Sequence, residues 1–420
     1  MATTTAEPTW VGTVRARGAA AFAATGFPTT RNEDWKYTPV TAIAEGGFAP
    51  AAQPPAHGVT AEALAPYLFG GEKPTVVFVN GRFDAALSNL ATLPAGVSVR
   101  PLAEALREMP QALEPRLGAI AAEQPFTARN ASLMQDGVVI HVAADVVVGR
   151  AIQVLFVADA GARGLELPVR NLVAAERHAK VTVVESFVGL TDAAYFTNAV
   201  TEVDVAAGAT VTHLKVQREG SGAYHVAHVE AKQARDSHLV SFSFAVGGRL
   251  ARTNVYTVLG GEGCGATLNG LYIGDGEQHL DHQTRIEHVA PNCYSREVYR
   301  GILDGAAHGV FNGKVYVHPE AQKTDGKQEN HTLLLSERAT IDTKPQLEIF
   351  ADDVKCTHGA TVGRLDQSSL FYMKSRGVGA ELAKQLLLYA FAADVLETIE
   401  AEAVREGLEA QVLQRYTGGQ

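Results

Sequence analysis

The chain has 420 residues, 46% of them hydrophobic and 20% charged, which is enough for one large core or two to three domains and is not a disordered composition. Its formal net charge of −10 excludes a nucleic-acid scaffold, which needs clustered Lys and Arg, and no basic run favours an anionic membrane. No apolar window reaches the roughly 18 residues of a membrane span, and the first residues do not resemble a secretory signal. Three widely spaced cysteines form no disulfide framework, so we expect a cytoplasmic protein.

The N-terminal region, residues 1–130, is expected to form a mainly helical domain. Apolar residues between Trp10 and Phe22 recur at helical spacing and are followed by Gly26, which predicts a helix that ends there. The run TVVFVNGRF, residues 75–83, predicts a short strand. Residues 101–120 are typical of a second helix, interrupted by its prolines.

The central region, residues 131–365, is expected to be a β-domain, since β-branched runs alternate with short corners rich in Gly, Ala and Asp. A small residue followed two positions later by a β-branched residue or leucine recurs in steps of 30, 28 and 29 residues, and Gly309 to Ala339 is another step of 30. Such a period, without long helices between the strands, predicts a stacked β-solenoid. An antiparallel sandwich with irregular loops is the alternative. The recurrences are Ala179–Val181, Ala209–Val211, Ser237–Leu239 and Ala266–Leu268.

The C-terminal region, residues 366–420, is expected to be helical. Two adjoining apolar rows follow the helical period, while Leu388 and Tyr389 fall outside them. A surface this wide must be covered, either by the chain itself or by a partner. The rows are Leu382, Leu386, Ala390 and Ala393, and Leu387, Phe391, Val395 and Ile399.

The densest polar stretch, GEQHLDHQTRIEH, contains residue types that ligate metals, and Cys293 follows it. If the segment is a strand, His279 and Asp281 share a face. Zinc-type spacings are absent, so we favour a row of hydrogen-bonded polar side chains at solenoid corners over a metal site. The candidate residues are His279, Asp281, His282, Glu287 and His288.

A second cluster, ADDVKCTHGATVG, places Cys356 and His358 two residues apart, so that on a strand both side chains point to one face and Lys355 to the other. A thiolate beside an imidazole is a reasonable soft-metal site, and a nearby lysine would favour the ionised sulfur. Two ligands cannot complete an iron site that usually has four. Unless the fold brings the other cysteines close, a second chain must supply the rest; a buried structural pair is the alternative.

Nucleotide-binding and nucleophile-elbow motifs are absent. The chain has no GxxxxGK[ST] and no GxSxG, and its glycine run at 260–265 lacks the strand–turn–helix setting of a dinucleotide fingerprint. We therefore expect a non-catalytic chain in which any ATP-driven step belongs to a partner.

Several long segments together resemble the SufD family of the SUF iron–sulfur cluster assembly system. They are TRNEDWKYTP (residues 30–39), a near-continuous stretch over residues 280–378 that includes AQKTDGKQENHTLLLSERATIDTKPQLEIFADDVKCTHGATVGRLD, and LFYMKSRGV at its end. The related SufB family usually has an acidic residue where this chain has Gly359, and a scaffold cysteine where this chain has Ala339. The resemblance is therefore to SufD, and a role as the primary cluster scaffold is not expected.

The resemblance implies a right-handed parallel β-helix between N-terminal and C-terminal helical domains. It also implies pairing with SufB through the β-helices, binding of the ATPase SufC through the C-terminal helices, and a transient iron or iron–sulfur site at the SufB interface, with a reduced flavin in the complex as a further expectation. The family's functional histidine falls on His358, with Cys356 beside it, and the apolar helix residues for SufC are Leu382, Leu386, Leu387 and Phe391. The alternatives are a self-sufficient homodimeric metal-binding solenoid and a β-helix enzyme acting on carbohydrate.

Overall fold

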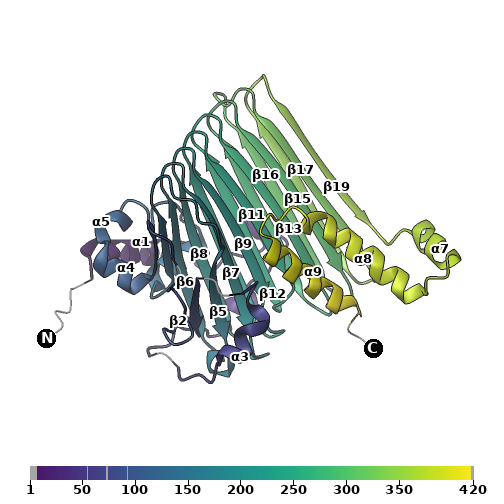
Figure 1. Ribbon diagram of the computed structural model, residues 1–420, viewed down its shortest axis with the longest axis horizontal. Coiled ribbons are helices and arrows are strands. Elements are labelled where there is room, and N and C mark those ends of the chain that lie inside the picture. Colours follow the sequence, from purple (N-terminus) through teal and green to yellow (C-terminus); the bar gives the residue numbers. More distant parts are fainter. Residues whose placement is uncertain (1–6, 54, 72–73, 92, 418–420) are drawn as a thin grey trace.

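Two long, twisted sheets face each other and form a parallel β-solenoid of about eight turns (Figure 1). The computed structural model describes residues 7–53, 55–71, 74–91 and 93–417. Within these ranges each turn adds one strand to each sheet, so every strand of the solenoid pairs with the second strand along the chain. The ten-stranded sheet contains, in spatial order, β19 (Lys355–Gly363), β17 (Asp325–Leu334), β15 (Tyr294–Leu303), β13 (Gly265–Gly274), β11 (His238–Ala245), β9 (Thr210–Arg218), β7 (Lys180–Gly189), β5 (Ile152–Ala158), β1 (Thr75–Val79) and β2 (Arg82–Phe83). The nine-stranded sheet contains β18 (Thr340–Ile349), β16 (His308–Val317), β14 (His279–His288), β12 (Leu250–Leu259), β10 (Tyr224–Gln233), β8 (Phe196–Val205), β6 (Glu166–Ala175), β4 (Val138–Val142) and β3 (Val97–Pro101).

The predicted solenoid is confirmed, and the alternative of an antiparallel sandwich is wrong. Val211 pairs in parallel register with Val181 on one side and Leu239 on the other, as the repeat predicts. For the next turn the predicted register is wrong by two residues, because Leu239 pairs with Ala266 and not with Leu268. Side chains alternate between the faces of a strand, so a shift of two residues keeps the same face inward and leaves the sequence pattern unchanged.

The later step from Gly309 is displaced in the same way. Gly309 pairs with Ile341, two residues beyond the Ala339 that the repeat predicts. Ala339 is a buried corner residue just before β18.

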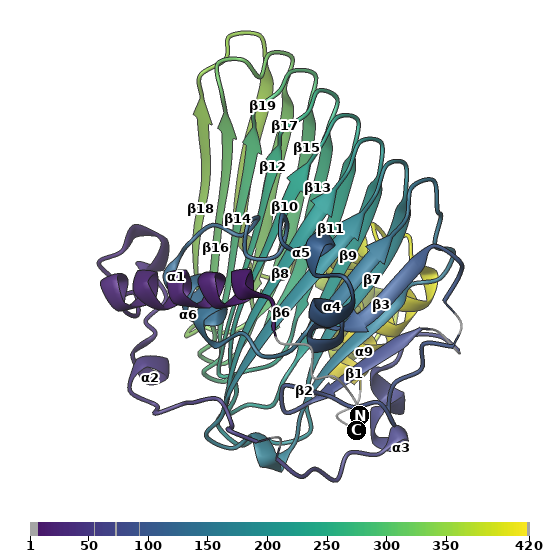
Figure 2. The same cartoon turned by 90° about the vertical axis from the view of Figure 1, so that its left-hand side faces the viewer.

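Most N-terminal helices, including α1, α4 and α6, cover the outer face of the nine-stranded sheet (Figure 2), whereas α3 and η2 pack against the ten-stranded sheet. The first helix is confirmed and ends at Gly26, whose φ of 64° suits glycine. The helix expected over residues 101–120 is two short helices, because Pro110 begins the second. The helical elements of this region are α1 (Thr9–Thr25), η1 (Glu33–Trp35), α2 (Thr41–Ala44), α3 (Ala61–Leu64), η2 (Ala65–Tyr67), α4 (Leu102–Glu108), α5 (Pro110–Leu113), α6 (Pro125–Leu133) and η3 (Ala160–Ala162).

The single strand expected over residues 75–83 is a hairpin, β1–β2, that extends the ten-stranded sheet. Asn80 and Gly81 form its turn with φ angles of 50° and 78°, which are the backbone angles that an Asn-Gly pair readily adopts. With β3 in the other sheet, the N-terminal region therefore contributes strands to both sheets in addition to its helices.

The C-terminal residues fold into α7 (Gln367–Ser375), α8 (Ala380–Leu396) and α9 (Glu402–Thr417), as the helical pattern predicts. Helices α8 and α9 lie on the outer face of the ten-stranded sheet, whereas α7 projects beyond the last turn (Figure 1). No helix in the described ranges is long and apolar enough to cross a bilayer.

The solenoid interior combines an apolar strip with a row of buried polar side chains. The apolar strip holds Val, Ala, Leu and Phe side chains from both sheets. Charged side chains inside the earlier turns are paired: Glu185 lies 3.2 Å from His213, and Glu219 lies 2.7 Å from His225. Pairing of this kind offsets much of the cost of removing charges from water.

Candidate functional site

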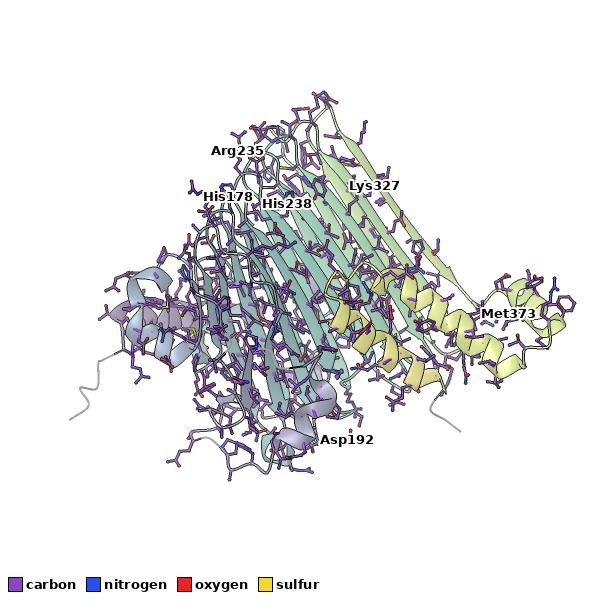
Figure 3. All side chains as sticks on the ribbon, in the orientation of Figure 1. His178, Asp192, Arg235, His238, Lys327 and Met373 are labelled. Atoms are coloured by element: carbon purple, nitrogen blue, oxygen red, sulfur yellow. The ribbon has the colours of Figure 1, made fainter. Side chains whose placement is uncertain are left out.

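The residues Cys356 and His358 lie on β19, the last strand of the ten-stranded sheet, and face the interior of the solenoid. They are in register with Gly326 and Gln328 of β17, which are buried, whereas Lys327 between them is exposed (Figure 3). Because no strand in the described part of the chain pairs with the outer edge of β19, the last turn is open and His358 is exposed. The two candidate ligands therefore share one face at the open end, as the spacing predicts.

Cys356 is half-buried among apolar side chains of the last two turns, including Val315 and Leu347. Burial raises the pKa of its thiol above the ordinary value, and the nearby Asp325 raises it further. The expectation that Lys355 would favour the thiolate is wrong, since burial and a carboxylate determine the shift. A bound cation would have to displace the proton from this sulfur.

The fold does not bring the other two cysteines to Cys356. Cys264 and Cys293 are buried at neighbouring corners, just before β13 and β15. Strand β17 lies between β15 and β19, which places Cys293 about two strand spacings, roughly 10 Å, from the last strand. Among the described residues no group of three or more His, Cys, Asp or Glu side chains could hold a metal ion.

The polar stretch over residues 279–288 is strand β14, and its alternation divides the candidate ligands between two faces. His282 and His288 point inward: His282 stacks on Tyr272 with ring centroids 5.0 Å apart, and the His288 Nε2 lies 3.0 Å from the Ser295 hydroxyl. Burial lowers the pKa of His282 to about 3 and that of His288 to about 4, so both rings are neutral at neutral pH. Both are core residues.

His279 and Asp281 share the outer face, as predicted, and Glu287 lies farther along it, ion-paired with Arg285. The Thr38 hydroxyl donates to Asp281 at 2.5 Å, so at 2.9 Å the His279 Nε2–H must donate to the same hydroxyl oxygen. The favoured interpretation as hydrogen-bonded polar side chains is therefore confirmed for these residues, although they lie within a strand and not at a corner.

A buried ion pair underlies this contact with the N-terminal segment TRNEDWKYTP. Arg252 of β12 donates to the Asp281 carboxylate at 2.8 Å, and neither side chain is exposed. The Trp35 ring covers the guanidinium, whose central carbon lies 3.6 Å from the ring centroid. Lys344 of β18 also ion-pairs with Glu33 of this segment. The segment thus contacts three strands, β12, β14 and β18, on the outer face and spans four turns of the solenoid.

Interior residues near the last turn were not identified from the sequence. Gln328 of β17, in register with His358, donates through its Nε2 to the Glu297 carboxylate of β15 at 2.7 Å. Both side chains are 1% exposed. Burial raises the pKa of Glu297 to about 7, and no basic side chain of the described chain lies close enough to lower it. Glu297 and Gln328 could have been identified only from the repeat, which aligns them with His358 on successive strands.

The apolar helix residues expected at a partner surface differ in exposure. Leu382 and Leu386 of α8 are 49% and 40% exposed, whereas Leu387 and Phe391 are half-buried, and Phe391 contacts Arg300 of its own chain. The prediction that Leu388 lies outside the apolar stripe is wrong. It is 1% exposed and packs on the sheet, because the buried face of α8 is centred on the row that it forms with Ala392, Val395 and Leu396.

The most exposed aromatic side chains of the described chain lie on α7 and were not predicted as partner residues. Phe371 and Tyr372 are 74% and 59% exposed, and α7 has no buried residue. Figure 3 shows Met373 of the same helix at the tip of this projecting arm, away from the solenoid. Exposed aromatic side chains of this size are typical of interaction surfaces.

Two family models together match most of the chain: the SufBD protein N-terminal region over residues 3–154, and the SUF system FeS cluster assembly SufBD core domain over residues 157–391. The chain is 35% identical over 398 residues to the iron–sulfur cluster assembly protein SufD of Escherichia coli, covering 94% of this chain and 90% of that protein. It is 30% identical over 382 residues to the iron–sulfur cluster assembly SufBD family protein slr0076 of Synechocystis, covering 89% and 84%.

A plant relative, the chloroplastic protein ABCI7 of Arabidopsis thaliana, is 28% identical over 400 residues, which cover 94% of this chain and 83% of that protein. The core model alone matches more than half of the chain, and the match includes both candidate ligands and α8 as far as Phe391. The chain therefore belongs to the SufBD family of SUF-system iron–sulfur cluster assembly proteins.

Proposed function

We propose that the chain is a non-catalytic subunit of a SUF assembly complex, that it pairs with a SufB-type chain through the last turn of its solenoid, and that it works in the cytoplasm. The single observation that carries this proposal is the open end. The outer edges of β18 and β19 have no strand partner within the described residues, and their peptide groups are available to another sheet. Apolar side chains line this end: Ile349 is 37%, Phe350 57% and Val362 48% exposed.

At this interface His358 and Cys356 would bind iron or a nascent cluster as cargo. They supply two soft or intermediate ligands on one face, and a second chain laid against β19 would bring the remaining ligands to the same place. The raised pKa of Cys356 fits a transient site, because a metal binds the thiolate and must compete with the proton for the sulfur.

The ATPase of the complex, a SufC-type chain, would dock on the C-terminal helices. Leu382 and Leu386 present an apolar surface on α8 that the chain itself leaves open, and Leu387 and Phe391 border it. We add Phe371 and Tyr372 of α7 to this surface because of their exposure. ATP hydrolysis belongs to that partner, and its closure would move α7 and α8 relative to the solenoid.

The test of the cargo site is His358→Ala in a reconstituted complex with SufB- and SufC-type chains. We expect normal complex assembly by size-exclusion chromatography and a several-fold lower yield of cluster by absorbance. The matched control is His331→Ala, which removes an imidazole from the outer face of the neighbouring strand and should leave the yield unchanged. A wild-type yield from the His358 variant would refute the ligand assignment.

The docking surface is tested by Leu382→Glu with Leu386→Glu, which should abolish capture of the SufC-type chain. Tyr294→Glu is the control, since Tyr294 is 38% exposed at the start of β15 and its ring contacts His238, not the C-terminal helices. Unchanged capture by the double variant would contradict the assignment. The alternative of a self-sufficient homodimer predicts that the chain purified alone carries stoichiometric iron.

A further inference from the structure

A single interior column leads from the core of the solenoid to the open end. Register pairs connect Glu297 of β15 to Gln328 of β17, and Gln328 to His358 of β19. Adjacent parallel strands are about 4.8 Å apart, so side chains in one column can contact their neighbours directly. Glu297 and Gln328 are 1% exposed, whereas His358 is exposed at the open end.

Gln328 is held in a fixed orientation. Its Nε2 donates to the Glu297 carboxylate at 2.7 Å, so the carbonyl oxygen Oε1 is the group left over. That oxygen is buried and has no hydrogen-bond partner within the described residues, an arrangement that costs free energy in an apolar interior. Gly313 of β16 leaves room for the amide, because a Cβ there would lie 2.2 Å from Nε2.

Glu297 differs from the other interior carboxylates. Glu185 and Glu219 of the earlier turns each lie within 3.2 Å of a histidine. Glu297 has two neutral groups, the Thr284 hydroxyl and the Gln328 amide, as its polar contacts, and no basic group lowers its pKa in the part of the chain that the structure describes. A buried acid without a cation is costly, and its retention beneath the candidate site points to a role other than core stability.

We propose that Gln328, oriented by Glu297, is a positioning residue for His358: its Oε1 accepts the N–H of the imidazole nitrogen that does not bind the cargo. Metal-bound histidines usually donate their second N–H to an acceptor that fixes the ring orientation and increases ligand basicity. The partnerless oxygen belongs to the residue in register with His358 on the neighbouring strand, and it is an acceptor of this kind. The inference rests on the proposed role of His358 as a ligand.

The test is Co²⁺ binding by the full-length chain in complex with a SufB-type chain, which supplies the remaining ligands, and binding is measured by titration of the ligand-field absorption. Gln328→Met removes the acceptor at similar length and should weaken Co²⁺ binding about 10- to 100-fold, the usual effect of losing such a partner. The double variant Glu297→Gln with Gln328→Glu exchanges amide and carboxylate, so residue 297 becomes the donor and residue 328 still presents an oxygen to His358. It should bind within about threefold of wild type. Thr332→Val, a buried change farther along the same face of β17, should have no effect.

A second measurement reports the hydrogen bond itself. In the Zn²⁺-loaded complex with a SufB-type chain, with only this chain labelled with ¹⁵N-histidine, the imidazole N–H of His358 should be slow to exchange in wild type and in the double variant, and fast in Gln328→Met. Wild-type affinity in folded Gln328→Met, or a double variant as weak as that single variant, would overturn the inference. If His358→Ala leaves Co²⁺ binding unchanged, the ligand assignment itself fails and the inference falls with it. Unchanged binding in Gln328→Met alone refutes only the positioning role.

Discussion

Replacing Asp281 with alanine should be among the most damaging single changes outside the apolar core. The carboxylate accepts from Arg252 at 2.8 Å, from Thr38 at 2.5 Å and from Gln283 at 2.6 Å, all out of contact with water. Its loss leaves the guanidinium of Arg252, which is 0% exposed, without a counter-charge. Breaking one side of a buried pair costs about 3–5 kcal/mol, because the remaining charge has neither solvent nor partner.

The assay uses the fluorescence of Trp35, which lies over Arg252, in a Trp10→Phe background so that only one tryptophan reports. Urea unfolding followed at this residue should show Asp281→Ala destabilised by about 3–5 kcal/mol. The control is Asp353→Ala, which breaks an exposed ion pair with Lys323 and should cost less than about 1 kcal/mol.

The double change Arg252→Met with Asp281→Leu separates the ion pair from the general packing of this region. Removing both charges leaves no uncompensated ion, so most of the loss seen in Asp281→Ala should be recovered. If Asp281→Ala and the Asp353 control differ by less than 1 kcal/mol, the guanidinium must have regained solvent or another partner, and the buried-pair reasoning is refuted.

Three further predictions concern the core. Burial raises the pKa of Glu297 from 4.5 to about 7, so between these pH values the folded chain holds a proton that the unfolded chain releases, and wild-type stability falls as the pH rises. Glu297→Gln should abolish that loss. Urea unfolding at pH 8 should show this variant to be about 3 kcal/mol more stable than wild type. Gly137→Ala should cost more than about 2 kcal/mol, because its Cβ would lie 2.0 Å from a backbone carbonyl oxygen, whereas Gly149→Ala, with open space around it, should be near neutral. Leu388→Ala should cost about 2–5 kcal/mol and Leu382→Ala less than about 1, which thermal unfolding of the two variants can compare.

The sequence predicts the architecture well because the solenoid repeats the same local pattern in every turn. Alternating β-branched residues and a period near 29 leave few other folds in which the inner faces are buried. The exact register is less well determined. Leu268 and Ala266 lie on the same face of the strand, so only the backbone pairing shows which of them is opposite Leu239. That pairing depends on the lengths of the corners, which the alternation of apolar and polar residues does not encode.

The candidate site was only half predictable. Cys356 and His358 could be placed on one face from their spacing alone. Gln328 and Glu297 lie 30 and 61 residues before His358 in the chain, and the stacking of turns places Gln328 beside His358 and Glu297 one strand farther in. A polar residue on an inward position cannot be distinguished in a single sequence from one at a corner. Leu388 was misplaced because α8 is apolar on more than one side, and only the docked sheet selects the buried side.

The two ends of the solenoid are built differently, and this difference is the reason that we place the proposed partner at the C-terminal end. At the N-terminal end both sheets finish in antiparallel strands, β2 and β3, so the stacking pattern of parallel turns stops there. At the other end β18 and β19 are parallel strands of full length with free outer edges, in the part of the chain that is described. A repeat protein that functions alone needs a polar terminal turn to close its core. Here the last turn instead exposes Phe350, Val362 and an open interior column to solvent. This exposure lowers the stability of the folded chain, and a second solenoid that packs on the same strand edges would bury these groups.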